Sequence, residues 1–515
     1  MSTDDDASTS PLTAEMGLWF AEARRRAAGL VVAPRVAEVG AVERIGDGVA
    51  VLSGLDTARQ DELLDFGEGV LGVAITLTRD RVSCVLLSPW EGVGAGHLVR
   101  GTGDVVRVPV GPGLLGRVLD PLGRPLDGGP PPPAEGHEPV DRPAPPVVDR
   151  ELVTRPLLTG LLVVDAMIPL GRGQRELIIG DRQTGKTAVA VDAIINQKRS
   201  DVLCVYCAVG QKSSSVNQVI DAVRRHGAPE RCLFVVGAAE GPPGLQWLAP
   251  YAACTMAEHF SDRGRDVLLV IDDLSKHAAV YRQMSLLLRR PPGREAYPGD
   301  VFHLHARLLE RSARLSVERG GGSLTALPIA ETQAGNLSAY IPTNLISITD
   351  GQICLEPGLF HAGQKPAVNV GLSVSRVGGR TQAPAMRALG VSLRLDYAQF
   401  TELEVFTRFG AVLEERAART IEHGRRLRSV LVQPRYRPLA LSRQVALLLA
   451  LGEGLLDSLA LPAVEDVKRL LDERMDAGCP ALAARIDAEG TLDEAGRAEL
   501  LAVLRALVES LGTKS

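Results

Sequence analysis

Short apolar runs alternate with turn signals over the first hundred residues. Residues 39–45 and 49–55 are apolar and flank a glycine-rich turn, and residues 70–77 precede residues 82–87 across a polar turn. Strands of this length, joined by such turns, are typical of a small all-β domain built from hairpins. The pattern therefore predicts a β domain over residues 35–100.

Glycine and proline dominate the next stretch, up to about residue 146, and indicate a stiff connector that lies along a surface. Over residues 152–384, apolar runs of strand length alternate with apolar positions at helical spacing. This alternation predicts a parallel α/β sheet. Beyond Met386 the strand pattern ends, and segments such as 397–418 and 441–451 predict an all-helical region.

An amphipathic helix is predicted near the N-terminus, where Met16, Trp19, Phe20 and Ala23 recur at helical spacing before three arginines. Such a helix either docks on another protein or packs on its own chain, and the sequence leaves both open. The predicted division is an N-terminal tail and helix over residues 1–34, a β domain over 35–100, an α/β domain over 101–385 and a helical domain over 386–515.

The composition is that of a soluble globular protein. The chain has 515 residues, which suggests about three domains. Its 57 basic residues against 62 acidic ones give a net charge of −5, so no overall basic field draws it to nucleic acid. The apolar run 445–451 falls far short of the roughly 20 residues that span a bilayer. The acidic N-terminus lacks the features of a signal peptide, and we expect a cytoplasmic chain.

Two pairs of potential metal ligands are poorly placed for a shared site. Cys204 and Cys207 have C-x-x-C spacing but lie in a predicted core strand, where positions three apart point to opposite faces. His303 and His305 are two apart in a predicted helix and do not share a face. The seven cysteines are scattered, which indicates reduced thiols.

The strongest motif is G-x-x-x-x-G-K-T at residues 180–187. An apolar run of strand length precedes it and a helical pattern follows it, which is the order of a P-loop. In that motif, backbone N–H groups and a helix N-terminus hold phosphates, the lysine reaches the outer phosphates and the hydroxyl ligates Mg²⁺. We therefore predict nucleotide binding by Gly180, Asp181, Arg182, Gln183, Thr184, Gly185, Lys186 and Thr187.

A P-loop also needs a carboxylate beside the metal, usually at the end of an apolar strand. The apolar run 267–271 ends in Asp272 and Asp273. We predict that Thr187 and Asp272 bind Mg²⁺, the aspartate through water. Asp273 fits a structural hydrogen-bonding role equally well.

Hydrolysis needs one more group, which activates or orients the attacking water. In hexameric P-loop ATPases it commonly stands at the end of the strand after the P-loop helix, where this chain has Gln211. An amide can orient water but cannot accept its proton, and some GTPases use glutamine in this way. We therefore expect tight binding of ATP or ADP with little turnover.

Several segments together resemble the alpha subunits of F-type ATP synthases. They are GDRQTGKT at 180–187, DDLSK at 272–276, RRPPGREAYPGD at 289–300 and GLSVSRVG at 371–378, within a similarity that runs over about 38–451. The resemblance implies a six-stranded β-barrel, a RecA-like nucleotide domain and a C-terminal helical bundle. It also implies that the nucleotide site is regulatory and non-catalytic, in agreement with Gln211.

The resemblance implies partners as well. They are beta subunits in an alternating three-plus-three hexamer, a gamma shaft, and a peripheral stalk that contacts the N-terminal helix. The complex would couple ATP synthesis or hydrolysis to H⁺ or Na⁺ transport. The chain would lie on the cytoplasmic side of a bacterial inner membrane and contact that membrane only through partner subunits. By position, Arg376 matches the arginine that reaches into the beta-subunit catalytic site. The alternative for Arg376 is a simple pair with a carboxylate at the interface.

The chain departs from the family pattern around the nucleotide base. Lys365 and Pro366 stand where the family shows arginine and proline. Gln433, Pro434 and Arg435 stand where it shows two glutamines flanking a glycine, and Gln433 is carried over as a nucleotide contact. Lysine lacks the planar fork of arginine, and Arg435 adds charge near the base. Because of these departures, the sequence does not show which purine the site selects. The same departures are similar to those of the alternate bacterial branch of the family that is associated with sodium transport.

Two other functions share the expected fold. A self-sufficient homohexameric motor, such as a secretion ATPase, would need a glutamate where Gln211 stands. A ring-forming RNA helicase like Rho should interleave basic and aromatic residues in its β domain, whereas residues 61–68 are acidic and hold one phenylalanine. The motifs favour the ATP synthase subunit over both.

Overall fold

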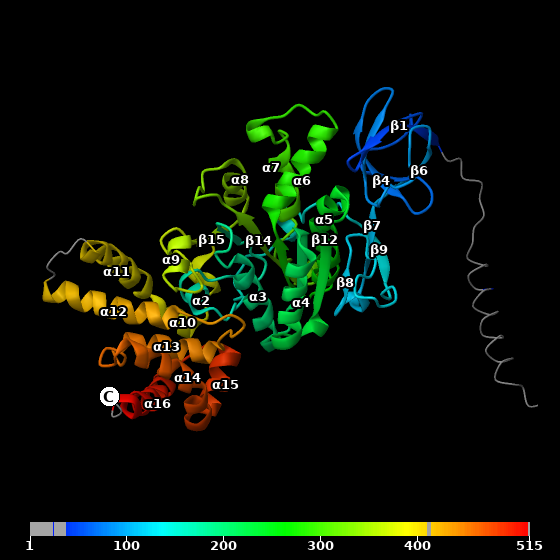
Figure 1. The fold of residues 1–515 in the computed structure, drawn as a ribbon. Coiled ribbons are helices and arrows are strands. Elements are labelled where there is room, and N and C mark those ends of the chain that lie inside the picture. Colours follow the sequence, from blue (N-terminus) through cyan, green and yellow to red (C-terminus); the bar gives the residue numbers. More distant parts are fainter. Residues whose placement is uncertain (1–23, 25–37, 409–413, 513–515) are drawn as a thin grey trace, which may run out of the picture.

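A barrel, an α/β domain and a helical region follow one another along the molecule in a computed structural model (Figure 1). The structure describes residues 24, 38–408 and 414–512. Apart from Arg24, the helix predicted within residues 1–34 lies outside these ranges. The barrel stands at one end, the large sheet in the middle and the C-terminal helices at the other end. The predicted architecture is therefore confirmed, while the residue limits of the domains stay predictions.

The N-terminal part is a closed six-stranded barrel with the strand order β1-β2-β5-β4-β3-β6. Its strands are β1 (Val39–Gly46), β2 (Val49–Ser53), β3 (Glu62–Asp65), β4 (Leu71–Leu77), β5 (Val82–Leu86) and β6 (Leu98–Val105). The predicted hairpins are the antiparallel pairs β1/β2 and β4/β5. Val42, Leu52, Leu64 and Leu86 fill the interior and are at most 2 % exposed.

The connector after the barrel contains three short strands that its glycine and proline content did not reveal. β7 (Arg107–Val110) and β9 (Gly136–Pro139) pair as an antiparallel ribbon. β8 (Val118–Leu119) pairs with β12 (Cys232–Ala238) at the edge of the large sheet. The connector therefore extends the central domain rather than merely lying on it.

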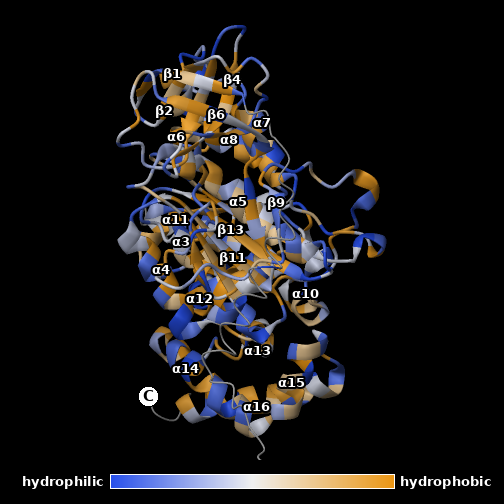
Figure 2. Cartoon of the chain, turned by 90° about the vertical axis from the view of Figure 1, so that its right-hand side faces the viewer, coloured by the Kyte–Doolittle hydropathy of each residue, from blue (hydrophilic) through white to orange (hydrophobic). Residues whose placement is uncertain are grey.

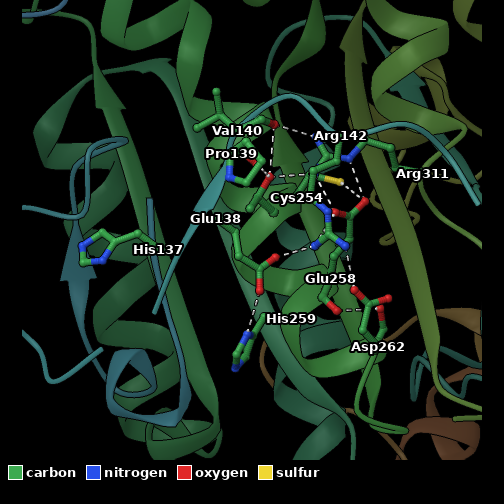
Figure 3. A network of polar contacts seen from close by, with 12 residues as sticks. His137, Glu138, Pro139, Val140, Arg142, Cys254, Glu258, His259, Asp262 and Arg311 are labelled. Atoms are coloured by element: carbon green, nitrogen blue, oxygen red, sulfur yellow. Dashed lines mark hydrogen bonds and ion pairs between the residues drawn. The ribbon is translucent and has the colours of Figure 1, made fainter. Parts of the chain in front are cut away.

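A buried ion pair fixes the end of this connector to the helix α5 (Pro243–Ser261) (Figure 3). The fully buried guanidinium of Arg311 donates to both carboxylate oxygens of Glu258 at 2.7 Å. It also donates to the carbonyl oxygen of Val140 in the connector at 2.9 Å. Arg142 approaches the same carboxylate to 3.3 Å. Charged groups that are shielded from water therefore join the connector to the central domain.

The central sheet has eight strands in the order β16-β15-β10-β14-β13-β11-β12-β8. Its remaining strands are β10 (Leu177–Gly180), β11 (Leu203–Gln211), β13 (Asp266–Asp272), β14 (Ser323–Glu331), β15 (Gly351–Leu355) and β16 (Val374–Ser375). Neighbouring strands are parallel, except that the edge strand β16 is antiparallel to β15. All of β13 is buried, as expected for a parallel sheet that is covered on both faces.

Helices cover both faces of this sheet and enclose two separate apolar clusters. One face carries α2 (Leu162–Met167), α3 (Lys186–Asn196) and α4 (Ser213–His226). The other carries α5, α6 (Leu274–Leu287), α7 (Val301–Leu309) and α8 (Tyr340–Ile348). Figure 2 shows the apolar residues concentrated in the strands between these layers.

The two doubtful pairs of metal ligands are separated as predicted. On β11, Cys204 belongs to the cluster on the α3 face and Cys207 to the cluster on the α5 face. On α7, His305 is fully buried whereas His303 is exposed. Neither pair can act as a two-ligand site.

The C-terminal region is helical, as predicted. Its helices are α10 (Pro384–Gly390), α11 (Leu393–Arg408), α12 (Glu415–Leu431), α13 (Leu441–Gly452), α14 (Leu461–Gly478), α15 (Pro480–Glu489) and α16 (Glu494–Gly512). Residues 441–451 of α13 are all buried, and α13 packs against α10, α15 and α16. Over the residues that the structure covers, no helix combines the length and apolar character needed to cross a membrane.

His277 on α6 and His305 on α7 form a fully buried pair, with Nδ1 of His277 3.2 Å from Nε2 of His305. Burial lowers the pKa of His277 to about 4 and lowers that of His305 as well. Unfolded histidine takes up a proton near pH ~6.5, whereas the native pair stays neutral to lower pH. The contribution of the pair to stability is therefore complete above that pH and is lost as the pH falls toward 4.

This pair predicts a pH dependence of stability that replacing one of the two histidines should reduce. Between pH 6.5 and 4, each neutral histidine should cost the native state about 1.4 kcal/mol of unfolding free energy per pH unit. The measurement is urea unfolding of the full-length chain at several pH values, for the wild type, His277→Asn and a control, His361→Asn, which changes an exposed histidine. His277→Asn should flatten the slope, and an unchanged slope would contradict the assignment.

Candidate nucleotide-binding site

The predicted P-loop is the turn between β10 and α3. Gln183 and Gly185 have left-handed backbone conformations, with φ of 63° and 96°. A side chain on Gly180 would meet the carbonyl oxygen of Leu355 at 2.5 Å, so this position requires glycine. α3 begins at Lys186, and no side chain caps its first turn. Its unpaired N–H groups and positive dipole end therefore favour an anion such as phosphate.

Lys186 bends back over the loop, where its ammonium donates to the carbonyl oxygen of Asp181 at 2.6 Å. The hydroxyl of Thr184 donates to the same oxygen at 2.8 Å. Burial lowers the pKa of Lys186, while the carboxylates of Glu331 and Asp273 favour its charged form. The loop thus holds a desolvated ammonium where the outer phosphates of a nucleotide are expected.

Thr187 and Asp272 meet directly beside this loop. The hydroxyls of Thr187 and Tyr206 both donate to Oδ2 of Asp272, at 2.8 and 2.9 Å. Asp272 is 3 % exposed, and burial raises its pKa against the opposing effect of these hydrogen bonds. Mg²⁺ prefers oxygen ligands and commonly combines one or two protein groups with substrate phosphates. The hydroxyl and carboxylate therefore fit the predicted metal.

Gln211 joins the same cluster from the end of β11. Its Nε2 donates to Oδ1 of Asp272 at 2.8 Å, and its Oε1 accepts from Nζ of Lys276 at 2.7 Å. The amide is thereby held between a carboxylate and an ammonium. It has no group that can take a proton from water.

Asp273 begins α6 and caps it, because its Oδ1 accepts the backbone N–H of Lys276 at 2.7 Å. Burial and the neighbouring Asp272 raise the pKa of Asp273 to about 7. Of the two roles that the sequence left open for Asp273, the structural hydrogen bond is present.

Glu331 is a carboxylate at this edge of the sheet that the sequence analysis missed. It ends β14 and is paired in register with Gly180 of β10. Its Oε2 accepts from Nε of Arg182 at 3.0 Å. The available signal was the apolar run 324–330 that ends in a glutamate, as the run before Asp272 ends in an aspartate.

A narrow cavity of about 30 Å³ adjoins the P-loop at Thr184 and Gly185. Gln433 lines it, together with Phe360, Lys365 and Arg435. The buried amide of Gln433 accepts the N–H of Leu162 at 2.6 Å and donates to the carbonyl oxygen of Gly160 at 2.9 Å. Both ends of this amide are therefore already bonded to the backbone.

Arg376 follows the edge strand β16 and is exposed. Its guanidinium donates to the carbonyl oxygens of Thr349 at 3.2 Å and Ile346 at 3.4 Å, at the end of α8. Ser375 pairs with Gly351, where β15 begins, whereas the P-loop follows the end of β10. Arg376 therefore lies at the opposite edge of the sheet from the chain's own P-loop. Its charge opposes the rise that burial causes in the pKa of the Glu176 carboxyl.

The predicted site residues thus form two groups. Lys186, Thr187, Asp272 and Gln211 lie together beside the P-loop, and Gln433 lies at the adjoining cavity. Arg376 stands apart. The loop, and the hydroxyl and carboxylate beside it that fit Mg²⁺, together form a site with the chemistry to hold a nucleotide.

Comparison with known proteins agrees with this geometry. The family model for the ATP synthase alpha/beta family beta-barrel domain matches residues 35–103. The models for the nucleotide-binding domain and the C terminal domain match residues 160–375 and 382–507. ATP synthase subunit alpha 3 of Paraburkholderia xenovorans is 55 % identical over 497 residues, which cover 96 % of this chain and 94 % of that protein. The chain belongs to the ATP synthase alpha/beta family.

Further relatives within this family are alpha subunits too. ATP synthase subunit alpha 1 of Paraburkholderia xenovorans is 57 % identical over 96 % of each chain. ATP synthase subunit alpha 2 of Burkholderia thailandensis is 58 % identical over 89 % of this chain and 83 % of its own length. The resemblance to alpha subunits that the motifs indicated is confirmed.

Proposed function

We propose that this chain is the regulatory, non-catalytic alpha subunit of a rotary ATP synthase, which holds ATP or ADP without hydrolysing it. The observation that carries this proposal is Gln211, which stands at the end of β11 and is bonded to Asp272 and Lys276. A complete P-loop supports binding, and the absence of a proton acceptor at Gln211 argues against turnover. Gln211 is therefore the residue that would allow nucleotide binding without hydrolysis.

Mg²⁺ belongs to the proposed ligand. Thr187 and Asp272 would hold it, the aspartate through water, because their oxygens lie together at the start of α3. When bound, the ion neutralises charge on the phosphate oxygens. Lys186 adds a second positive charge from the loop, and the N–H groups of α3 orient the phosphates.

Arg376 is proposed to act in the catalytic site of a neighbouring beta subunit. Its exposure and its place at the sheet edge opposite the P-loop exclude it from its own nucleotide and leave it free to reach across an interface. Bonds to the last carbonyl groups of α8 hold the guanidinium in place. A planar cation that is always charged suits transition-state oxygens.

The remaining parts of the proposal concern the complex. They are an alternating hexamer with beta subunits around a gamma shaft, peripheral-stalk contacts through residues 1–34, and coupling to H⁺ or Na⁺ transport. The proposed place is the cytoplasmic side of a bacterial inner membrane, reached only through partner subunits. The proposed limits of the other domains are residues 35–100, 101–385 and 386–515.

Nucleotide binding by the full-length chain tests the site. Lys186→Ala should weaken Mg-ATP binding by about tenfold to a hundredfold, because one hydrogen-bonded charge on the phosphates is lost. Isothermal titration calorimetry measures the affinity. Removal of Mg²⁺ should weaken ATP binding to the wild type, whereas it should change the affinity of the Thr187→Val variant little. The control is Lys198→Ala, which changes an exposed lysine outside the loop. Equal affinity of the wild type and Lys186→Ala would overturn the site.

A further inference from the structure

A buried carboxyl group lies directly behind the segment that carries Arg376. It belongs to Glu176, which immediately precedes β10 and is fully buried. This carboxyl lies against Gly351, where an added side chain would meet Oε2 of Glu176 at 2.6 Å. Gly351 is the partner of Ser375 in the pairing of β15 with β16, and Ser375 precedes Arg376. The carboxyl therefore lies beside the strand pair that leads into Arg376, whereas the P-loop follows the other end of β10.

The buried amide of Gln174 connects this carboxyl to Ser375. Its Nε2 donates to Oε2 of Glu176 at 2.7 Å and to Oγ of Ser375 at 3.2 Å. Its Oε1 accepts the N–H of Gly171 at 2.8 Å, so each polar atom of the amide has a partner. Ser375 in turn donates from Oγ to the carbonyl oxygen of Pro169 at 2.8 Å. Without an acceptor on Glu176, a buried N–H group of Gln174 would lose its partner, and the amide would be less firmly held toward Ser375.

A second carboxyl group, that of Asp350, holds the backbone of Arg376. The carbonyl oxygen of Asp350 accepts the N–H of Arg376 at 2.8 Å. The carboxylate of Asp350 accepts two bonds from the guanidinium of Arg175, at 2.8 and 3.0 Å. Asp350 thus has Arg175 as its ion-pair partner, and the side chain of Arg376 keeps its bonds to the end of α8. The backbone of Arg376 is therefore fixed by a group whose charge is already paired.

The surroundings of Glu176 favour its neutral form. Within the part of the chain that the structure describes, Oε1 of Glu176 has no hydrogen-bond partner. Burial raises the pKa of this carboxyl well above its usual range, the charge of Asp350 adds to the rise, and the bond from Gln174 and the charge of Arg376 oppose it. An ionised carboxylate here would attract the guanidinium of Arg376 toward its own chain. The neutral acid accepts the bond from Gln174 without such an attraction.

We infer that Glu176 is a positioning residue for Arg376, because its carboxyl orients Gln174 and, through Gln174, holds Ser375 and the arginine that follows it. Glu176 is fully buried, so it cannot contact a nucleotide on a neighbouring subunit and acts only through Arg376. Catalysis by a positioned group is sensitive to displacements of about 1 Å, which gives such a support a measurable effect. The inference rests on the proposed function, since it requires Arg376 to act in the catalytic site of a beta subunit.

Steady-state ATP hydrolysis by the assembled complex tests this inference. Glu176→Leu removes the acceptor and should lower kcat by about tenfold to a hundredfold, the effect of a misplaced catalytic group. KM for ATP should stay within about twofold of the wild type, because Arg376 acts on the transition state. Glu176→Gln keeps an uncharged acceptor and should recover most of the lost kcat. Mg-ATP binding to the chain's own P-loop should be the same in both variants and the wild type.

The matched control is Glu473→Leu, the same change at an exposed glutamate of α14, which should leave kcat unchanged. In an Arg376→Ala background, Glu176→Leu should slow turnover by less than about twofold more, because the group that it positions is already gone.

Three results would overturn the inference alone and leave the proposed function standing. They are wild-type kcat in Glu176→Leu, a loss in Glu176→Gln as large as in Glu176→Leu, and an undiminished further loss in the Arg376→Ala background. Weaker Mg-ATP binding to the P-loop of Glu176→Leu would likewise assign Glu176 a general structural role. Wild-type turnover in Arg376→Ala would overturn the proposed role of Arg376 and the inference together.

Discussion

Replacing Arg376 by alanine is expected to slow steady-state ATP hydrolysis by the assembled complex by about 10³- to 10⁵-fold, the range found when an arginine finger is lost. The reason is that Arg376 is exposed at the sheet edge away from its own P-loop, so its charge is available to a neighbouring site. The measurement is phosphate release by the purified complex at saturating ATP. Nucleotide binding to the alpha-type chain itself should stay unchanged.

Arg380→Ala is the control for that experiment, because Arg380 is an exposed arginine a few residues farther along the chain. It should leave turnover within about twofold of the wild type, as expected of a surface position. Arg376→Lys keeps the charge but loses the planar fork, and it should recover little of the activity. If Arg376→Ala kept wild-type turnover, Arg376 would have no catalytic role. Its hydrogen bonds to the end of α8 would then be purely structural.

Replacing Arg311 by methionine should lower the free energy of unfolding by about 3–5 kcal/mol, the usual cost of leaving one partner of a buried ion pair alone. Methionine keeps the apolar stem of the side chain, whereas the carboxylate of Glu258 loses two hydrogen bonds of 2.7 Å (Figure 3). The bond from Arg311 to Val140 is lost as well, which weakens the attachment of the connector to the central domain. Urea unfolding of the full-length chain measures the change.

The matched control is Arg319→Ala, which removes an ion pair to Asp149 from an arginine side chain that is 56 % exposed. Such surface pairs contribute at most about 1 kcal/mol. Adding Glu258→Gln to Arg311→Met should recover part of the loss, because no unpaired charge then stays buried. Equal effects of Arg311→Met and Arg319→Ala would show that the buried pair does not hold the connector.

The fold and the P-loop were predictable because they depend on local patterns. Continuous apolar runs before Gly180 and Asp272 mark strands that are buried on both faces. The glycines of the loop and the helical spacing after it are likewise contained in a short stretch of sequence. The strand order brings Asp272 to Thr187, because β13 and β10 both flank β14 in a parallel sheet.

The parts that the sequence did not reveal depend on contacts between distant segments. Gln433 bonds to the backbone of Gly160 and Leu162, and nothing in its local sequence indicates that its amide is occupied. Arg311 and Glu258 become a buried pair only when α5 meets the loop after α7. A pattern of apolar and polar positions reports burial along one element, but it does not report which charged groups meet.

Glu331 illustrates the same limit at the site. Its position after an apolar strand resembles that of Asp272, yet only the sheet order shows that β14 lies beside the P-loop strand. Its carboxylate is paired with Arg182, whose side chain is 81 % exposed. Glu331 is therefore a carboxylate beside the P-loop strand that the pattern of the sequence alone did not connect to the site.

The most direct test of the account is phosphate release from Mg-ATP by the purified full-length chain without its partners. The account predicts that ATP binds and stays intact, with turnover no faster than about 10⁻³ s⁻¹, the range of glutamine-containing sites that lack an arginine finger. Glu331→Gln should leave this rate unchanged. Turnover of several molecules per second by the isolated chain would contradict a non-catalytic site, and its loss in Glu331→Gln would identify Glu331 as the base.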